Sequence, residues 1–288
     1  MSAQGTVALD VIRATFTTSV DALCENEALV RSTGAVEAVH QARVETRRLR
    51  SALRTFRGLL EPAWTRVLLE ELGWLGEHLG LVRDADVVLG HIEAFANRLP
   101  LDDRAALAAV VESMSERRKL ARAALLAEMN GERFARLLAL VRDAGAHPPV
   151  TPKAFEVGRK QLVRLIRRPW RRLKRGVARL GDHPSDAELH RIRIRVRRVR
   201  YALEAVAPVA SKRASAAIER IVQLQEILGD VHDRVIEREQ LRILAATSDD
   251  AAFVAGEIAG GALLEAARAR KSWRRAWHRA ARKRLRFW

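Results

Sequence analysis

Apolar residues recur along the chain at the spacing of α-helices. On a helix that turns about 100° per residue, Leu49, Leu53, Phe56 and Leu60 fall on one face, which is predicted to be buried. Ala, Leu, Arg and Glu are abundant and favour helices, whereas runs of β-branched residues are short. The pattern therefore predicts an all-α fold, with helices over about 6–30, 35–58, 152–180 and 186–207.

Two sequence motifs recur in the same order in the two halves of the chain. HQARVETRRLRSAL begins at His40 and HRIRIRVRRVRYAL at His190, and both read H-x-x-R-x-x-x-R-R-x-R-x-A-L. LGEHLGLVRD begins at Leu75 and LQEILGDVHD at Leu224, and both read L-x-E-x-L-G-x-V-x-D. Because both motifs repeat at nearly one spacing, the chain is interpreted as a tandem duplication with halves of about 1–148 and 149–288.

Each half is predicted to be a four-helix bundle with an interrupted arm. A long first helix precedes the His/Arg helix, a third helix is expected to end at the Leu-Gly-x-Val-x-Asp turn, and one or two more helices close the half. Asp84, Asp86 and Asp233 lie at this turn. They are interpreted as caps of the next helix, or as ion-pair partners of nearby arginines, rather than as catalytic acids.

The first repeated motif places basic side chains on one stripe of its helix. Counted from His40, the arginines of the first copy fall between about 280° and 340°, beside the apolar face: Arg43, Arg47, Arg50 and Arg54. The second copy repeats the stripe with His190, Arg193, Arg197 and Arg200. Cations four residues apart repel each other, so an anionic partner is predicted. A single stripe is more often a solvated face, but the repeated spacing favours binding.

The composition points to the same class of partner. The chain has 52 Lys and Arg against 35 Asp and Glu, a formal net charge of +17. Guanidinium groups hold phosphate oxygens in pairs, although a GC-rich genome would also raise the arginine content. An extended phosphate chain would offer oxygens at regular intervals along each stripe and release counterions on binding.

The chemistry predicted for these side chains is binding rather than catalysis. His40 and His190 share one repeat position, and each can either gain a proton beside an anion or donate a hydrogen bond as a neutral ring. The sequence has no metal-ligand spacing beside them, no Gly-rich phosphate loop and no nucleophile elbow. No catalytic residue, metal or cofactor is therefore expected.

The repeated motifs resemble those of the CHAD family, the conserved histidine α-helical domain. The resemblance rests on the two H-x-x-R-x-x-x-R-R-x-R helices and on L-G-x-V-R-D-A-D-V (Leu79 to Val87) with its partner L-G-D-V-H-D (Leu228 to Asp233). It covers essentially the whole chain, 1–288, as a single domain. It implies two pseudo-symmetric four-helix bundles around a basic central channel that binds inorganic polyphosphate. It also implies association with polyphosphate granules in bacterial or archaeal cells.

The resemblance further implies a set of binding residues: His40, Arg43, Arg47, Arg48 and Arg50, with His190, Arg193, Arg197, Arg198 and Arg200. Arg197 stands where many relatives carry lysine, a departure that keeps the charge. Some members of the family are fused to a triphosphate-hydrolysing tunnel domain, whose E-x-E-x-K pattern is absent here, so a stand-alone binding protein is expected. Further candidates come from neighbouring helices: Arg118, Arg122, Arg164 and Arg168.

The sequence is also compatible with two other functions. A nucleic-acid-binding protein would have the same overall charge, but the stripes lack interleaved aromatic residues on which bases would stack. A polyphosphate kinase or phosphatase is the third hypothesis.

The remaining features concern location. Cys24 is the only cysteine, the N-terminus does not resemble a secretory signal, and no stretch approaches the roughly 20 apolar residues of a membrane span. A cytoplasmic protein is expected. Near the C-terminus, Trp273 and Trp277 are expected to pack the last helix into the bundle, with contact to an anionic membrane as the alternative.

Overall fold

The protein is all-helical in the computed structural model, which describes residues 7–96, 101–245 and 249–288. The first half contains α1 (Val7–Ser32), α2 (Val36–Thr55), α3 (Pro62–Ala96), α4 (Leu101–Met129) and α5 (Glu132–Ala146). The second contains η1 (Pro152–Phe155), α6 (Arg159–Arg164), α7 (Arg167–Ala178), α8 (Asp186–Val206), η2 (Ala207–Val209), α9 (Arg213–Ala245), α10 (Asp249–Ala280) and η3 (Lys283–Leu285). The all-α prediction is confirmed.

The predicted Leu-Gly-x-Val-x-Asp turn is wrong. Gly80 and Asp84 lie inside α3, which continues to Ala96, and the second copy of the motif lies inside α9, which continues to Ala245. A glycine weakens a helix by about 1 kcal/mol but does not end it where neighbouring residues pack well. The reading of these aspartates as helix caps is therefore wrong as well.

The predicted helix over 152–180 is broken into η1, α6 and α7. Pro169 is the reason for the second break, because proline has no N–H to donate to the carbonyl of Leu165 and its ring would collide with that group. The chain instead turns at Leu165 and Ile166, and Pro169 lies in the first turn of α7, where proline is tolerated.

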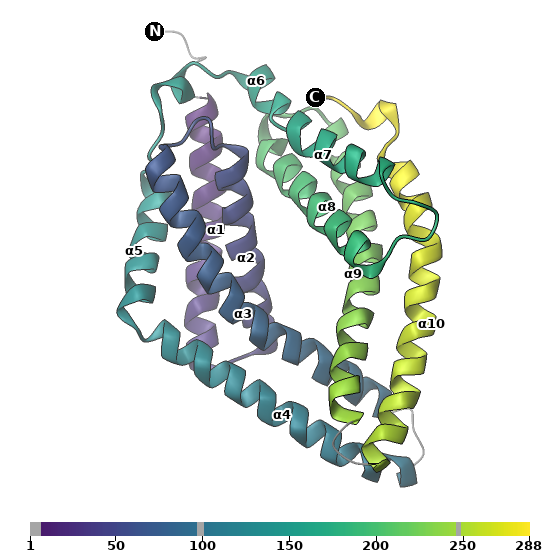
Figure 1. Ribbon diagram of the computed structural model, residues 1–288. Helices are drawn as coiled ribbons and strands as arrows, with labels where there is room; N and C mark the ends of the chain where they lie inside the picture. The colour runs from purple at the N-terminus through teal and green to yellow at the C-terminus, as the bar shows by residue number, and fades with distance from the viewer. Residues whose placement is uncertain (1–6, 97–100, 246–248) are drawn as a thin grey trace.

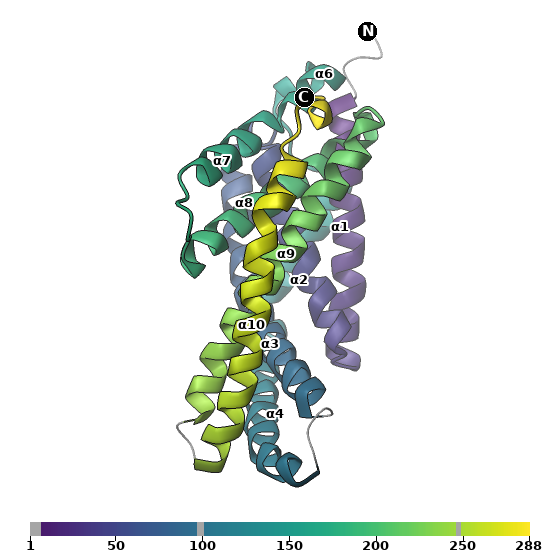
Figure 2. The same cartoon turned by 90° about the vertical axis from the view of Figure 1, so that its right-hand side faces the viewer.

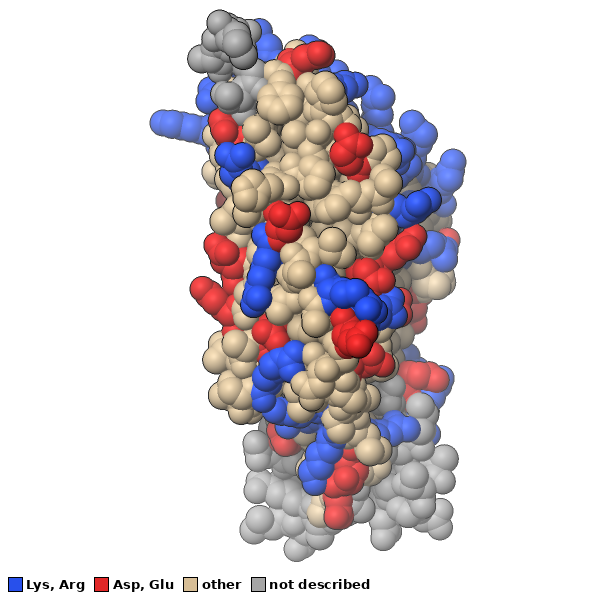
Figure 3. Space-filling view, turned by 90° about the vertical axis from the view of Figure 1, so that its left-hand side faces the viewer, with Lys and Arg blue, Asp and Glu red and all other residues tan. Residues whose placement is uncertain are grey.

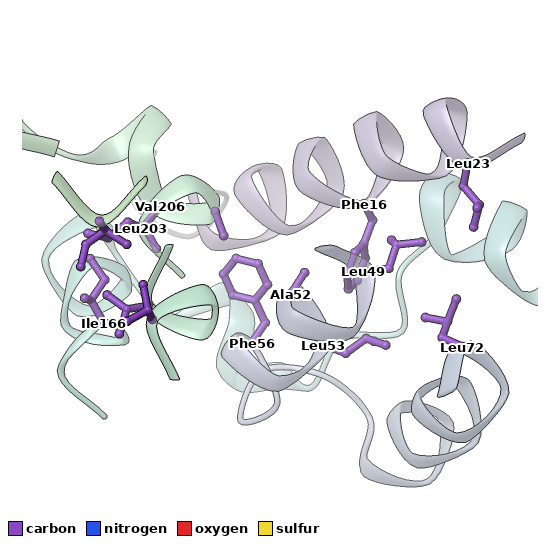
Figure 4. Packing of buried hydrophobic residues seen from close by; sticks show 14 of the residues in the cluster. Phe16, Leu23, Leu49, Ala52, Leu53, Phe56, Leu72, Ile166, Leu203 and Val206 are labelled. Atoms are coloured by element: carbon purple, nitrogen blue, oxygen red, sulfur yellow. The ribbon is translucent and has the colours of Figure 1, made fainter. Parts of the chain in front are cut away.

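One buried core joins the two halves of the chain. Leu49, Leu53, Phe56 and Leu60 are buried, as predicted from their spacing. Figure 4 shows Phe16 of α1 beside Leu49 of α2, and Phe56 on the side that faces Ile166, Leu203 and Val206 of the second half. At about 25 cal/mol per Å² of buried apolar surface, such a core supplies most of the driving force for folding. It also fixes α2 and α8 relative to each other.

The long helices extend beyond this core. The far ends of α3 and α4 run to the bottom of the molecule, where they meet the far ends of α9 and α10 (Figure 1). The view from the side shows these four helix ends lying together (Figure 2). A second buried cluster joins them, formed around Val88, Ile92, Met114, Leu241 and Ile258. Within the described residues, no helix is apolar enough over a sufficient length to cross a membrane.

The end of α10 packs as the sequence predicted. Trp273 and Trp277 are buried, and Trp277 stacks on Trp170 of α7 with ring centroids 5.6 Å apart. Arg275 and Arg279, on the same helix, are exposed. The tryptophans therefore anchor α10 to the second half of the protein.

Candidate functional site

The arginines of α2 and α8 face each other across the contact between these two helices. The helices pack together, and Arg193 and Arg197 of α8 lie within electrostatic range of Arg43 and Arg47 of α2. Arg54 and Arg198 form a further pair of this kind. We call Arg43, Arg47, Arg50 and Arg54 the α2 row, and Arg193, Arg197 and Arg198 the α8 row.

Local sequence positions both rows. In α8, Ser185 and Glu188 form a capping box: the Glu188 N–H donates to the Ser185 hydroxyl at 3.3 Å, and the Ser185 N–H donates to the Glu188 carboxylate at 2.8 Å. The apolar face of α8 is buried beside its basic stripe, and the same is true of α2. Each row therefore lies at the edge of the core, where its side chains are partly desolvated.

Burial, together with neighbouring positive charges, lowers the pKa values of Arg54 and Arg197. Burial, followed by the positive charges of Arg47 and Arg193, lowers the pKa of Arg197 to about 9. Burial and the charges of Arg50 and Arg198 lower the pKa of Arg54 to about 10. These groups stay protonated at neutral pH, so the site carries concentrated positive charge.

Carboxylates neutralise only part of that charge. Arg43 Nη1 donates to Asp84 at 3.0 Å, and Arg193 lies 3.8 Å from Asp233. The expected pairing of aspartates with stripe arginines is therefore confirmed at Asp84 and Asp233. Within the described chain, Arg47, Arg50 and Arg197 form no ion pair with a carboxylate.

Three guanidinium nitrogens of the rows are buried without an acceptor. These atoms are the Nε atoms of Arg47, Arg50 and Arg193, and no acceptor in the described protein reaches them. A buried, unmatched donor costs about 1–3 kcal/mol, and more when it is charged. Anionic oxygens placed between the rows would remove this cost.

Glycines of α3 let the α2 row lie close to the α3 backbone. A Cβ atom on Gly80 would lie 3.4 Å from Arg43 Nη2, and one on Gly73 would lie 3.5 Å from Arg50 Nη2. Residues three or four apart share a helix face, so Gly73, Gly76 and Gly80 form one smooth strip beneath these side chains. Larger residues there would compete with the guanidiniums for space.

Two predicted binding residues are engaged by the protein's own carboxylates. Arg48 pairs with Glu45 at 2.6 Å and lies 3.7 Å from Glu204. Arg200 pairs with Glu204 at 2.6 Å, so its charge is largely neutralised within the protein. Arg198 lies within electrostatic range of Arg50. Glu204 thus links α8 to α2.

Each repeated histidine lies beside the residue that precedes the final aspartate of the second motif. This residue is Arg83 in the first copy and His232 in the second. The His40 pKa is lowered by burial and then by Arg83. Nδ1 of His190 lies 3.1 Å from Nδ1 of His232, so one of these nitrogens donates to the other. Burial, followed by Arg193 and His190, lowers the pKa of His232 to about 3. The free protein therefore holds His232 as a neutral hydrogen-bonding ring.

The candidates from neighbouring helices have different environments. Arg118 pairs with the buried Asp86 at 2.6 Å. The Arg122 guanidinium occupies the place that a Cβ would take on Gly34, whose positive φ of 59° suits glycine. Arg164 and Arg168 are exposed on α6 and α7 and share no charge interaction with either row among the described residues.

Several residues near the rows were not predicted. Arg83 lies beside His40 and Arg43, and His232 lies beside His190 and Arg193. Both occupy the same variable position of L-x-E-x-L-G-x-V-x-D, so the repeat itself carried the signal. Arg172 of α7 and Arg195 of α8 lie near Arg198, and no motif marks them.

The outer face that bears α5 has a different character. Basic and acidic side chains are interspersed over it (Figure 3). Two ion pairs on α5 belong to this pattern: Arg133 with Glu71 at 2.7 Å, and Arg136 with Glu132 at 3.3 Å. Charge on this face is locally balanced, unlike the charge of the two rows.

Comparisons with known proteins agree with the fold. The structure resembles PptA from Streptomyces chartreusis, with a TM-score of 0.78 and 23% identity, over 96% of this chain and all of that one (100%). It also resembles the crystal structure of the CHAD domain from the plant Ricinus communis, with a TM-score of 0.71 and 28% identity, over 96% of this chain and 93% of that one.

Sequence comparisons identify the family. The uncharacterized proteins Rv2226 and MT2285 of Mycobacterium tuberculosis are each 32% identical over 240 residues, which cover 77% of this chain. The chain spans only 44% of the length of these relatives. Residues 14–242 match the CHAD domain family. The chain therefore belongs to the CHAD domain family.

Proposed function

We propose that this protein binds inorganic polyphosphate without chemical turnover, and that the phosphate chain lies between the α2 and α8 rows. The observation that carries the proposal is the electrostatic repulsion between Arg47 and Arg197, two partly buried guanidiniums from different halves, neither of which forms an ion pair with a carboxylate in the described chain. Folding brings these like charges together at a cost, and a bound polyanion offsets it.

The dimensions of the rows suit an extended phosphate chain. Arg43 to Arg54 span about 16 Å at 1.5 Å per residue, and Arg193 to Arg198 run along the facing helix. Successive phosphates carry charge at short regular intervals, so neighbouring guanidiniums can each bind an oxygen. Binding of this kind releases counterions and weakens steeply with salt.

The same features favour polyphosphate over nucleic acid and over catalysis. Tyr201, which lies within electrostatic range of Arg197, is buried, so it offers no face for stacking bases. Asp84 and Asp233 are engaged by Arg43 and Arg193, which suits a positioning role better than proton transfer.

A competition experiment tests the proposal. Labelled long-chain polyphosphate is bound to the purified chain at physiological salt, and unlabelled polyphosphate, duplex DNA or RNA is added at equal phosphate concentration. Polyphosphate is expected to displace the label far more effectively than either nucleic acid. Equal displacement by DNA or RNA would favour the nucleic-acid hypothesis, and steady release of phosphate with Mg²⁺ and nucleotide would identify an enzyme.

Association with polyphosphate granules forms the cellular part of the proposal. A fluorescent fusion of the chain is expected to colocalise with granules in cells that accumulate polyphosphate. The variant Arg47→Gln with Arg197→Gln is expected to remain diffuse. If the two proteins localise identically, granule association does not depend on the arginines of the rows.

A further inference from the structure

A second group of arginines lines a pocket between the start of α9 and the end of α10. The pocket has a volume of about 590 Å³, within the roughly 300–1,000 Å³ range of small-molecule sites. Its basic residues are Arg213, Arg220, Arg279, Arg282 and Arg284, and none of them belongs to the α2 or α8 row. We call this the α9–α10 pocket.

The charge of the α9–α10 pocket is poorly balanced. Its lining contains five arginines and one acidic residue, Glu219. Arg220 lies 3.7 Å from Glu219 and donates to Gln223 at 2.9 Å. Across the residues that the structure describes, Arg213, Arg279, Arg282 and Arg284 form no ion pair with a carboxylate. A concave surface with this excess of guanidinium groups attracts and holds anions.

The walls of the pocket are held in place by the core. Leu285, which lines the pocket, also packs against the main hydrophobic cluster. Trp288 packs edge-on against Trp170 with ring centroids 5.4 Å apart, and Arg286 Nη2 donates to the Ala281 carbonyl at 2.8 Å. The segment that carries Arg282 and Arg284 is thereby tied to α7 and α10. Such ordering reduces the entropy lost when a ligand binds.

We propose that the α9–α10 pocket is a separate binding site for a compact oligophosphate group. Guanidiniums from three places in the chain converge there, and each matches a pair of phosphate oxygens. An excess of four positive charges suits an anion with several charges better than a single phosphate. The group can belong to a short inorganic oligophosphate or to the triphosphate of a nucleotide. The site does not depend on the function proposed for the rows.

Calorimetric titration with inorganic tripolyphosphate tests this site. The background is Arg47→Gln with Arg197→Gln, which removes two of the unpaired charges of the rows and so weakens binding there. In this background we expect one equivalent of tripolyphosphate to bind. Adding Arg279→Ala and Arg282→Ala is expected to raise the Kd about tenfold or more, because a hydrogen bond to a charged group is typically worth at least that factor.

A matched control removes two positive charges from α10 outside the pocket. Arg268 and Lys271 are exposed and do not line the pocket, so Arg268→Ala with Lys271→Ala is expected to leave the Kd within about twofold. The charge-conserving pair Arg279→Lys with Arg282→Lys is expected to retain part of the affinity. An equal loss in the control pair, or no loss in the pocket pair, would overturn the proposal.

Parallel titrations with ATP and inorganic phosphate identify the source of the group. Binding of tripolyphosphate alone supports an inorganic ligand, whereas equal binding of ATP, lost with the same pocket variant, supports a nucleotide. Inorganic phosphate binding as tightly as tripolyphosphate would contradict a site for several phosphates. If the rows do not bind polyphosphate, the unmodified chain and the background variant will bind tripolyphosphate equally. The change in Kd caused by the pocket variant then still shows whether the pocket is a binding site.

Discussion

Arg43 Nη1 donates a hydrogen bond to Asp84 across 3.0 Å, and this contact ties the start of the α2 row to α3. The second half has a looser counterpart, in which Arg193 and Asp233 are 3.8 Å apart. The repeated motifs of the sequence thus meet in space: the arginine of the first is oriented by the aspartate of the second. The arginines that follow, Arg47 and Arg197, have no such partner in the described chain.

Adjacent arginines on α2 are expected to differ in function. Arg47→Gln should weaken polyphosphate binding by about 1.5–3 kcal/mol, because it removes a charged donor from the row. Arg48→Gln should change binding much less and instead lower the free energy of unfolding by about 1 kcal/mol, since Arg48 pairs with Glu45 and Glu204. Calorimetric titration and urea unfolding of both variants provide the test. A larger binding loss for Arg48→Gln would contradict the assignment.

Both halves are expected to contribute to one site. Charge reversal at Arg43 and Arg47, or at Arg193 and Arg197, should each weaken polyphosphate binding by several kcal/mol while the helical circular dichroism is retained. The control reverses Arg136 and Arg268, which are exposed outside the rows. Unchanged affinity in both row variants would place the polyphosphate site elsewhere.

Removing a row charge is expected to stabilise the free protein. Burial and neighbouring cations lower the pKa of Arg197 to about 9, so its charged form is disfavoured in the folded state. Arg197→Met should therefore raise the free energy of unfolding by on the order of 1 kcal/mol while weakening polyphosphate binding. Arg191→Met, at an exposed position of the same helix, is the control. If Arg197→Met lowers the free energy of unfolding and Arg191→Met does not, the packing of the Arg197 side chain stabilises the fold by more than its buried charge destabilises it.

The His232 ring is expected to make stability depend on pH. Its pKa is lowered to about 3, below the roughly 6.5 of an unfolded histidine, so the unfolded chain binds more protons between these values. The stabilisation is present above pH 6.5 and is lost as pH falls towards 3, by at most about 1.4 kcal/mol per unit. The charges facing His232 are those of Arg43, Arg193 and Arg197, with His190 beside it.

Urea unfolding at several values from pH 7 to 5 measures this effect, above the range where most carboxylates titrate. His232→Gln should make the profile less steep, because the amide can still hydrogen-bond but does not titrate, whereas His40 and His190, whose pKa values burial also lowers, still contribute. His183→Gln, on the exposed turn before α8, should leave it unchanged. A profile that is equally steep with and without His232 would show that another group titrates.

The helix content, and the residues that share each face of a helix, could be predicted from local sequence. The periodicity of Leu49, Leu53 and Phe56 depends only on the 3.6-residue turn of the helix, and their burial agrees with it. The basic stripes could be predicted from the same periodicity, and the repeated motif indicated that the two stripes are related. The breaks were less predictable, because a Leu-Gly pair can end a helix or continue through it, depending on what packs beside it.

Contacts between distant segments required the tertiary structure. No pattern in the sequence indicated that Glu204 engages Arg48 and Arg200, that Arg198 lies near Arg54, or that Arg282 joins Arg213 at a pocket. Spacing along a helix defines which side chains share a face, but the partner of that face depends on how helices far apart in sequence pack around a common core. That packing decided which arginines are neutralised by carboxylates and which are left facing one another.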